Sequence, residues 1–150
     1  MRALLQRVSS ASVETDGKTV SSISQGLLIL LGIEEADDES DIAWLCQKIP
    51  QMRIFPDAEG KMNLSLHDTA GEALVVSQFT LHASTKKGNR PSFLKAAAPS
   101  KSQPLYEAFC AAMETSISKP IGRGIFGADM KVSLTNDGPV TIWIDSRDKE

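Results

Sequence analysis

Residues 26–32 are Gly-Leu-Leu-Ile-Leu-Leu-Gly and contain the longest apolar run of the chain, Leu27 to Leu31. Because no polar residue alternates with the apolar ones, this run predicts a strand that is buried on both faces. It is far too short to cross a bilayer, and residues 1–7 contain no apolar stretch of signal-peptide length. We therefore expect a soluble, cytoplasmic protein with no membrane partner.

The composition is that of an ordinary globular protein. The chain has 150 residues, of which 41% are hydrophobic and 23% charged, so we expect a single domain over residues 1–150 with a real core. Sixteen Lys and Arg against nineteen Asp and Glu give a net charge of -3, so overall charge does not indicate a nucleic-acid partner. Two cysteines and two histidines argue against a disulfide scaffold and a metal site. We expect neither a metal nor a cofactor.

The regions around the apolar run predict hairpins. Residues 2–8 and 11–14 have strand patterns, and residues 18–23 supply a returning strand. Asp16-Gly17 between them predicts a tight turn, because both residues tolerate positive φ.

Two helices are predicted. Asp37 or Asp38 caps the first, and Pro50 marks its end. Its apolar face contains Ile42, Leu45, Cys46 and Ile49. The second begins near Ser102, with Pro104 in its first turn.

The remaining strands complete an α+β pattern. Further strands are predicted over residues 53–55, 62–64 and 72–81. Residues 130–134 and 140–144 alternate in polarity, and the turn-forming residues 136–139 between them predict a hairpin. With about seven strands and more hairpins than βαβ crossovers, the chain predicts one α+β domain on a mixed, mainly antiparallel, twisted sheet.

The residues show no side-chain catalytic machinery. Residues 122–127 match GxGxxG, but a helix precedes them and a strand follows, so they predict a surface turn rather than a nucleotide site. Ser77 lacks the flanking glycines of a nucleophile elbow, which disfavours a triad with His67 or His82. We expect both histidines at the surface or in loops. Cys46 and Cys110 fall near apolar helix faces and are expected to be inert core thiols.

Charge is unevenly distributed. Residues 73–106 contain no acid but five cations, which are Lys86, Lys87, Arg90, Lys95 and Lys101. This stretch fits a solvated loop and a phosphate-binding loop equally well. The six acids within residues 34–41 favour a solvated loop and helix start. Gly138-Pro139 fits either an ordinary turn or a cis peptide bond.

Two segments resemble the paired signatures of the D-aminoacyl-tRNA deacylase family. They are Ser77-Gln78-Phe79-Thr80-Leu81 and Asn136-Asp137-Gly138-Pro139-Val140-Thr141. Further segments are similar to the family in the same order along the chain: Gln6-Arg7-Val8, Ala11-Ser12-Val13, residues 26–32, Arg53-Ile54-Phe55, Gly60-Lys61-Met62-Asn63, Arg90-Pro91-Ser92-Phe93 and Phe126-Gly127-Ala128-Asp129-Met130. The resemblance therefore covers nearly the whole chain.

The resemblance implies a homodimeric, barrel-like hydrolase that acts in proofreading. Such an enzyme binds aminoacylated tRNA rather than DNA and cuts the ester between a D-amino acid, or glycine, and the 3′-terminal adenosine. No triad is needed, because an aminoacyl ester is already activated and the neighbouring 2′-hydroxyl can assist.

The resemblance also assigns roles to residues. Ser77 and Gln78 line the catalytic site, the backbone N–H of Phe79 stabilises the oxyanion, and Thr80 positions rather than attacks. Gly138-Pro139 corresponds to a cis dipeptide that reaches into the partner subunit's site and excludes L side chains. Remaining roles fall to Arg7, which braces that dipeptide, to Phe126 and Met130 in the adenosine pocket, and to Lys86, Lys87 and Arg90 on tRNA phosphates.

Two departures from the family pattern, at His82 and at Arg123-Gly124, bear on substrate preference rather than on the reaction. Three alternatives remain open. The first is an editing deacylase for small L-amino acids, with the same fold and a trans Gly-Pro bond. The second is a non-catalytic tRNA-binding module, and the third is an esterase that depends on Ser77.

Overall fold

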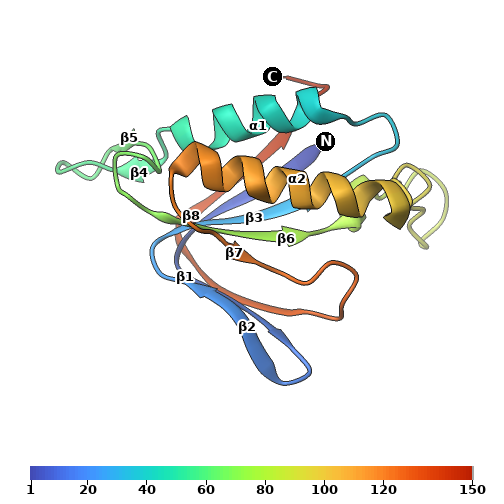
Figure 1. Cartoon of the computed structure of the whole chain (residues 1–150). Helices are drawn as coiled ribbons and strands as arrows, with labels where there is room; N and C mark the ends of the chain where they lie inside the picture. Colours follow the sequence, from blue (N-terminus) through green and yellow to red (C-terminus); the bar gives the residue numbers. More distant parts are fainter. Residues whose placement is uncertain (150) are drawn as a thin grey trace.

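The computed structural model describes residues 1–149, in which two α-helices pack on one face of a strongly curved sheet (Figure 1). The strands are β1 (Arg2–Thr15), β2 (Lys18–Ile23), β3 (Gly26–Gly32), β4 (Phe55–Pro56), β5 (Met62–Leu64), β6 (Glu72–Ser77), β7 (Gly122–Arg123) and β8 (Lys131–Asp145). The helices are α1 (Glu39–Gln51), the 3-10 helix η1 (Phe79–His82) and α2 (Pro99–Ile117). No helix among these residues combines the length and apolar character that crossing a membrane requires.

The main sheet has six strands in a mixed arrangement. Its order is β2-β1-β3-β6-β7, and β8 pairs with β1 on the other side. All pairings of β1 are antiparallel, whereas β3–β6 and β6–β7 are parallel. β4 and β5 form a separate antiparallel pair. The predicted α+β class and the mixed, barrel-like sheet are confirmed.

Strand β1 organises the sheet. Its first half pairs with β3 on one side and β8 on the other, and its second half pairs with β2 and β8. Two irregularities in the β1–β8 register, flanking Val8, lie between these halves. The predicted turn at Asp16-Gly17 is confirmed by φ values of 52° and 72°.

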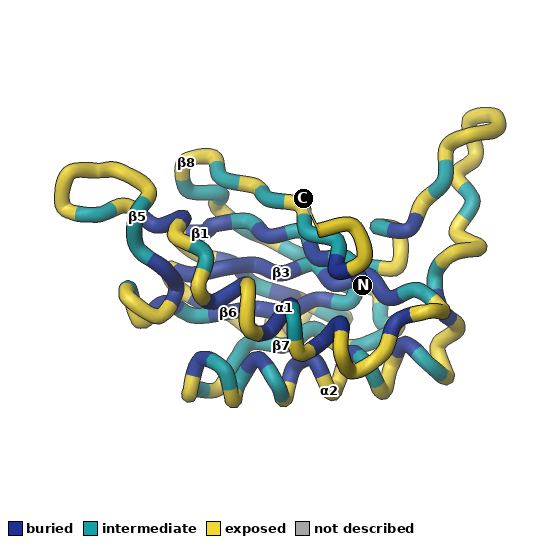
Figure 2. The backbone as a smooth tube through the Cα atoms, turned by 90° about the horizontal axis from the view of Figure 1, so that it is seen from above, coloured by how far each residue is buried: buried dark blue, intermediate teal, exposed yellow. Residues whose placement is uncertain are grey.

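Strand β3 is buried on both faces, as its unbroken apolar run predicts. Leu27, Ile29 and Leu31 belong to the core beneath the helices, whereas Leu28 belongs to a second core with Val8. Figure 2 shows this central band of buried backbone with exposed loops around it. Strand β3 is therefore a buried support for its parallel neighbour β6 and for the segment that follows β6.

The helix starts are partly as predicted. Asp38 caps α1 through a capping box, in which the Asp41 carboxylate accepts from the Asp38 N–H at 2.9 Å. Pro50 lies inside the last turn, and the helix ends one residue later. The predicted start of α2 near Ser102 is wrong, because α2 begins at Pro99, whose missing N–H costs nothing in the first turn.

The predicted hairpin over residues 130–144 is wrong. Those residues form the single strand β8, whose two halves both pair with β1. Residues 136–141 depart from the ladder locally, between the pairs Val8–Asn136 and Gln6–Thr141. The turn-forming residues therefore make a protrusion from a continuous strand.

Two other strand predictions need correction. The strand expected over residues 72–81 stops at Ser77, and the chain then turns into η1. The short strand expected over residues 53–55 is displaced to Phe55–Pro56, where it pairs with β5.

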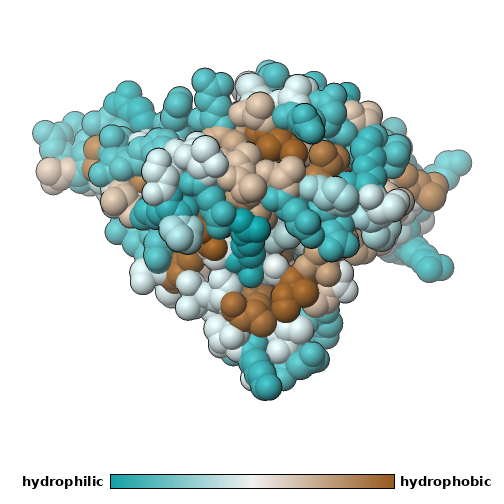
Figure 3. All heavy atoms as spheres, viewed as in Figure 1, coloured by the Kyte–Doolittle hydropathy of each residue, from teal (hydrophilic) through white to brown (hydrophobic). Residues whose placement is uncertain are grey.

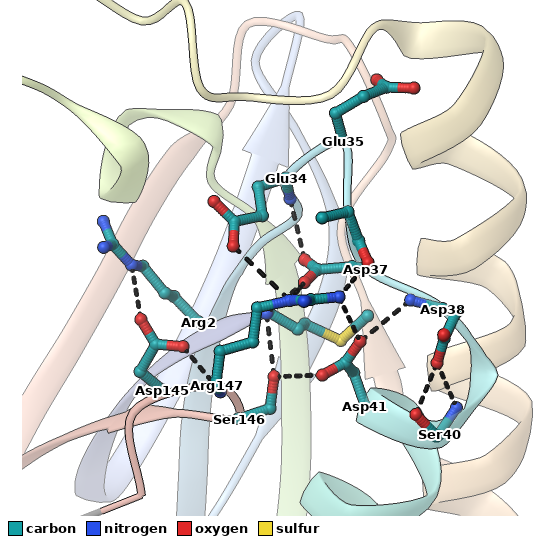
Figure 4. A network of polar contacts seen from close by, with 12 residues as sticks. Arg2, Glu34, Glu35, Asp37, Asp38, Ser40, Asp41, Asp145, Ser146 and Arg147 are labelled. Carbon is teal, nitrogen blue, oxygen red and sulfur yellow. Dashed lines mark hydrogen bonds and ion pairs between the residues drawn. The ribbon is translucent and has the colours of Figure 1, made fainter.

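The acidic run over residues 34–41 is not wholly solvated, contrary to expectation. Asp37 and Asp41 are buried, and both pair with Arg147, at 3.2 Å and 3.5 Å (Figure 4). Ser146 also donates to Asp41 at 2.6 Å. The run therefore fastens the start of α1 to the segment after β8.

Candidate active site

A pocket of about 710 Å³ opens beside the end of β6. Ser77, Gln78 and Phe79 form one wall, and the start of α2 closes another. Phe126 and Met130, from the connection between β7 and β8, form a third. Most of its lining is apolar, and Figure 3 shows apolar surface exposed below the helices in the view of Figure 1. Such a cavity suits a flat apolar group with a few polar contacts.

The chain changes direction between β6 and η1. The Gln78 N–H donates to the Leu31 carbonyl at 2.7 Å, which ties this corner to β3. Gly32 allows the close approach, because a Cβ there would lie 3.0 Å from the Gln78 carbonyl oxygen. The Gln78 side chain donates to Thr80 Oγ1 at 2.5 Å.

Two backbone donors are left free at this corner. The bonds that close η1 run from Leu81 N–H to Gln78 and from Ala83 N–H to Thr80. Among residues 1–149, the N–H groups of Phe79 and Thr80 find no acceptor. Phe79 is 57% exposed, and its ring meets that of Phe93 edge-on, with ring centroids 5.2 Å apart. A donor beside an apolar pocket can stabilise charge on a substrate oxygen.

The Phe126 wall is held by a buried tyrosine. The Tyr106 hydroxyl donates to the Val75 carbonyl at 2.9 Å, and its ring lies 5.9 Å from that of Phe126. Burial raises the pKa of Tyr106, so it remains a neutral donor. Met130 fills the space that Gly124 leaves, since a Cβ on Gly124 would lie 2.7 Å from its sulfur.

The second cluster lies at the protrusion of β8. Gly138-Pro139 is exposed and its peptide bond is cis. Arg7 is 8% exposed, and its Nε donates to the Asp137 carbonyl at 2.7 Å while Nη1 donates to Ile54 at 2.6 Å. The guanidinium therefore links the protrusion to the segment before β4.

The side chain of Asn136 closes the protrusion. Its Oδ1 accepts from the Val140 N–H at 2.8 Å, and its Nδ2 donates to Thr141 Oγ1 at 2.9 Å. Gly138 has φ +140°, a conformation that L side chains rarely adopt. The hydrogen bonds of Asn136 therefore hold the backbone of the protrusion in one conformation.

Within one chain, the predicted site residues fall into two groups. The pocket includes Ser77, Gln78, Phe79, Phe126 and Met130. It does not include the Arg7 side chain, Gly138 or Pro139. Thr80 lies next to the pocket and is exposed.

The basic loop extends over residues 83–98. A bridge between Ser84 and Ser92 closes it, and a second bridge joins Ala96 to Glu34. Lys86, Lys87 and Arg90 are exposed and form no ion pair within residues 1–149. The cations are therefore available to an external anion.

The titratable groups do not form a triad. His82 is 1% exposed, contrary to the expectation of a surface or loop position, whereas His67 is exposed as expected. Burial lowers the pKa of His82, and neither ring nitrogen has a hydrogen-bond partner among residues 1–149, so it does not activate Ser77. Both cysteines are buried, as predicted, and burial raises the pKa of Cys46 to about 12 and of Cys110 to about 11.

The GxGxxG match lies in the connection from β7 to β8. Residues 122–127 run from β7 into a turn and then toward β8, so no helix follows the GxGxxG match. No cluster of three metal-ligating side chains is present within residues 1–149.

Three residues near the site have no role predicted from the sequence: Phe93 lines the pocket, Tyr106 packs against Phe126, and Arg2 donates to the Leu81 carbonyl. For Phe93, the sequence offers only the family resemblance of the segment Arg90-Pro91-Ser92-Phe93. Tyr106 is the one tyrosine of the chain, and nothing in its helical spacing separates it from core residues.

Comparisons with known proteins identify relatives of this chain over nearly its whole length. The profile of the family described as D-Tyr-tRNA(Tyr) deacylase matches residues 4–145. A D-aminoacyl-tRNA deacylase of Bacteroides thetaiotaomicron is 60% identical over all of both chains. One of Christiangramia forsetii is 60% identical over 99% of each chain.

Two solved structures share the fold. One, of a protein described as c-Myc DNA Unwinding Element Binding Protein, has a TM-score of 0.92 at 38% identity, and the match covers 97% of this chain and 98% of that one. The other, of a probable eukaryotic D-amino acid tRNA deacylase, has a TM-score of 0.81 at 17% identity and supports the fold alone. It covers 95% of this chain and 97% of that one.

Proposed function

Because the chain belongs to the D-Tyr-tRNA(Tyr) deacylase family, we propose that it hydrolyses the ester between a D-amino acid and the 3′-terminal adenosine of tRNA. It is a hydrolase of the D-aminoacyl-tRNA deacylase type. The observation that carries its mechanism is the free backbone N–H of Phe79 at the rim of the pocket.

The Phe79 N–H is the oxyanion donor. Water attacks the ester carbonyl carbon, the carbonyl oxygen gains negative charge, and the bond to the 3′ oxygen then breaks as that oxygen takes a proton. One donor aimed at the developing charge lowers the barrier by about 3 to 4 kcal/mol. An aminoacyl ester is already activated and the neighbouring 2′-hydroxyl can assist, so positioning and polarisation suffice.

Neither hydroxyl beside the pocket is the nucleophile. Thr80 Oγ1 accepts from Gln78 Nε2, and no basic side chain within residues 1–149 hydrogen-bonds to it. Ser77 has no hydrogen bond to a histidine among residues 1–149. Because an unactivated hydroxyl is a weak nucleophile, we assign Thr80 and Ser77 to substrate positioning.

Phe126 and Met130 hold the terminal adenosine. They line the same pocket as Phe79, whose size and mostly apolar lining suit a nucleobase. Lys86, Lys87 and Arg90 contact tRNA phosphates from the exposed loop. Affinity for tRNA should then fall as salt concentration rises.

Gly138-Pro139 supplies stereochemical selection to the other subunit of a homodimer. The dipeptide is exposed and does not line the pocket of its own chain, which supports a role in a partner's pocket. Its carbonyls hold the substrate α-amino group, so an L side chain meets main chain whereas a D side chain or glycine fits. A twofold axis then makes two equivalent sites, each completed by the other subunit.

The test is hydrolysis of one tRNA charged separately with D-tyrosine, L-tyrosine and glycine. Rapid loss of the D-tyrosyl and glycyl esters with the L ester spared supports the proposal. Hydrolysis of small L-aminoacyl esters instead identifies an editing deacylase for those residues. Salt-dependent tRNA binding without hydrolysis identifies a binding module. Since charged tRNA is used where translation occurs, we place the enzyme in the cytoplasm.

A dependence on Ser77 is tested separately. Ser77→Ala should keep most of the activity, and serine-directed reagents should leave the enzyme unlabelled. Complete loss in a folded variant that still binds tRNA would instead support an esterase.

A further inference from the structure

Arg2, at the start of β1, contacts η1 at Leu81, near the end of that short helix. Its Nη1 donates to the Leu81 carbonyl at 3.0 Å, and its Nε donates to Asp145 Oδ2 at 2.9 Å. The guanidinium also lies 5.3 Å from the centre of the Trp143 ring. Figure 4 shows Arg2 turned toward Asp145. Arg2 therefore joins η1 to β8 across the start of β1.

These contacts complete a two-point attachment of η1. The Gln78 N–H holds the beginning of the corner to Leu31 of β3, and Arg2 holds its end through the Leu81 carbonyl. The free N–H of Phe79 lies between the two attachments. Loss of either hydrogen bond would leave one end of η1 less firmly held and so allow this N–H to move.

The His82 side chain at the end of η1 makes no hydrogen bond within residues 1–149 that could replace the one from Arg2. His82 is buried against Gly32, with 3.1 Å between its Cδ2 and a Cβ built on that glycine, and its ring nitrogens have no partner within residues 1–149. Its Nδ1 lies 3.9 Å from Glu34 Oε2, which is beyond hydrogen-bond distance. Of the side chains described, Arg2 is the one whose hydrogen bond reaches the backbone of Leu81.

We propose that Arg2 is a positioning residue for the deacylation, holding η1 so that the Phe79 N–H faces the substrate oxygen. The inference rests on the proposed function. Arginine suits the task because its planar, forked donors satisfy the carbonyl and the carboxylate at fixed angles, which the single ammonium of lysine cannot do. A loss of about 1 Å in placement can reduce a rate about a hundredfold.

The simplest competing explanation is that Arg2 and Asp145 form only a surface ion pair. The Arg2 side chain is 25% exposed, and ion pairs of this kind contribute little to stability. That explanation predicts no effect on chemistry. The experiment must therefore separate turnover from stability.

The test compares Arg2→Gln, Arg2→Lys and a matched control, Arg147→Gln. Arg147 belongs to the same polar network and pairs with Asp37 and Glu34, but within residues 1–149 no hydrogen bond or ion pair joins it to η1. We expect Arg2→Gln to lower kcat for D-tyrosyl-tRNA between about tenfold and a hundredfold, with KM within about twofold. Arg2→Lys should recover part of this loss, and Arg147→Gln should keep the wild-type kcat at a lower thermal stability.

Hydrogen exchange supplies a readout that does not depend on activity. In Arg2→Gln, the amides of Leu81 and Ala83, which close η1, should exchange about tenfold faster while those of β3 stay protected. Wild-type kcat in folded Arg2→Gln, or unchanged exchange at these two amides, would overturn the proposal. A wild-type protein that spares the D ester would refute the proposed function instead. Exchange alone would then decide whether Arg2 holds η1.

Discussion

A mixed dimer of two defective variants tests whether each active site contains residues of both subunits. The first variant is Gly138→Ala. Its new Cβ would lie 2.8 Å from Arg7 Nη2 and 2.9 Å from Val140 Cγ2, in a backbone conformation of φ +140°. Such a conformation costs about 1–3 kcal/mol in a residue other than glycine. The chain should remain folded, because a domain of this kind has about 5–15 kcal/mol of stability.

The second variant removes the proposed oxyanion donor. Phe79→Pro has no backbone N–H, and Phe79→Ala is its matched control because it loses the ring but keeps the N–H. From the barrier that one such donor lowers, we expect Phe79→Pro to lose about a hundred- to a thousandfold in kcat. We expect Gly138→Ala to lose about a hundredfold through displacement of the protrusion. Phe79→Ala should lose markedly less than Phe79→Pro.

The mixed dimer is the decisive species. Subunits with two different C-terminal affinity tags are coexpressed, and dimers that contain one Phe79→Pro and one Gly138→Ala chain are purified through both tags. If Gly138 acts in the partner's site, one of the two sites contains both defects and the other contains neither. The mixed dimer should then hydrolyse D-tyrosyl-tRNA at about half the wild-type rate.

Activity as low as that of the two parents would refute the cross-subunit arrangement, because each site would then contain one defect. A monomeric wild-type protein in solution would refute it as well. Equal losses in Phe79→Pro and Phe79→Ala would remove the N–H from the mechanism and leave the aromatic ring as the relevant group.

Three further outcomes are expected. Thr80→Ala should keep D-ester hydrolysis within about tenfold of wild type, since no base activates its hydroxyl; complete loss in a folded, tRNA-binding variant would make Thr80 a chemical participant. Burial lowers the pKa of His82 below 6.5, with Arg2, Glu34 and Asp37 as its charged neighbours, so the unfolded chain takes up a proton before the folded chain as pH falls. The free energy of unfolding, measured by denaturant titration, should therefore decrease as pH falls below 6.5. His82→Phe should make that decrease smaller. The same pH dependence in both proteins would show that His82 is not its source. Thiol reagents at neutral pH should label Cys46 and Cys110 only after unfolding, since burial raises the pKa of both thiols; rapid labelling of the native protein would show that these helices open.

The sequence predicts the elements whose signals are local. The unbroken run of β3, the turn at Asp16-Gly17 and the capping residue of α1 are all found where the pattern places them. The apolar alternation after Ser77 continues through Phe79 and Leu81, so periodicity alone extends β6 too far. The chain turns there because Gln78 bonds to a neighbouring strand, which is a long-range contact.

The error at β8 has the same origin. Residues 136–139 have the composition of a hairpin turn, and the two flanking stretches alternate as hairpin strands do. What prevents the hairpin is β1, which is long enough to pair with both stretches at once. The buried position of His82 is likewise fixed by packing against Gly32 and is not visible in its sequence neighbourhood.

The proposed site also explains why side-chain motifs give so little information about this chain. The proposed donor at Phe79 is a main-chain N–H, and the proposed selecting surface at Gly138-Pro139 is main chain as well. Groups that belong to every residue cannot be found by residue type; what marks them is the set of side chains that hold them in place. Three such side chains hydrogen-bond to the backbone. Arg7 donates to the Asp137 carbonyl and Asn136 accepts from the Val140 N–H at the protrusion of β8, and Arg2 donates to the Leu81 carbonyl in η1. It follows that substitutions at these three positions should change turnover or D/L discrimination more than substitution of either hydroxyl, Ser77 or Thr80, and that ordering is the direct test of a site built from backbone.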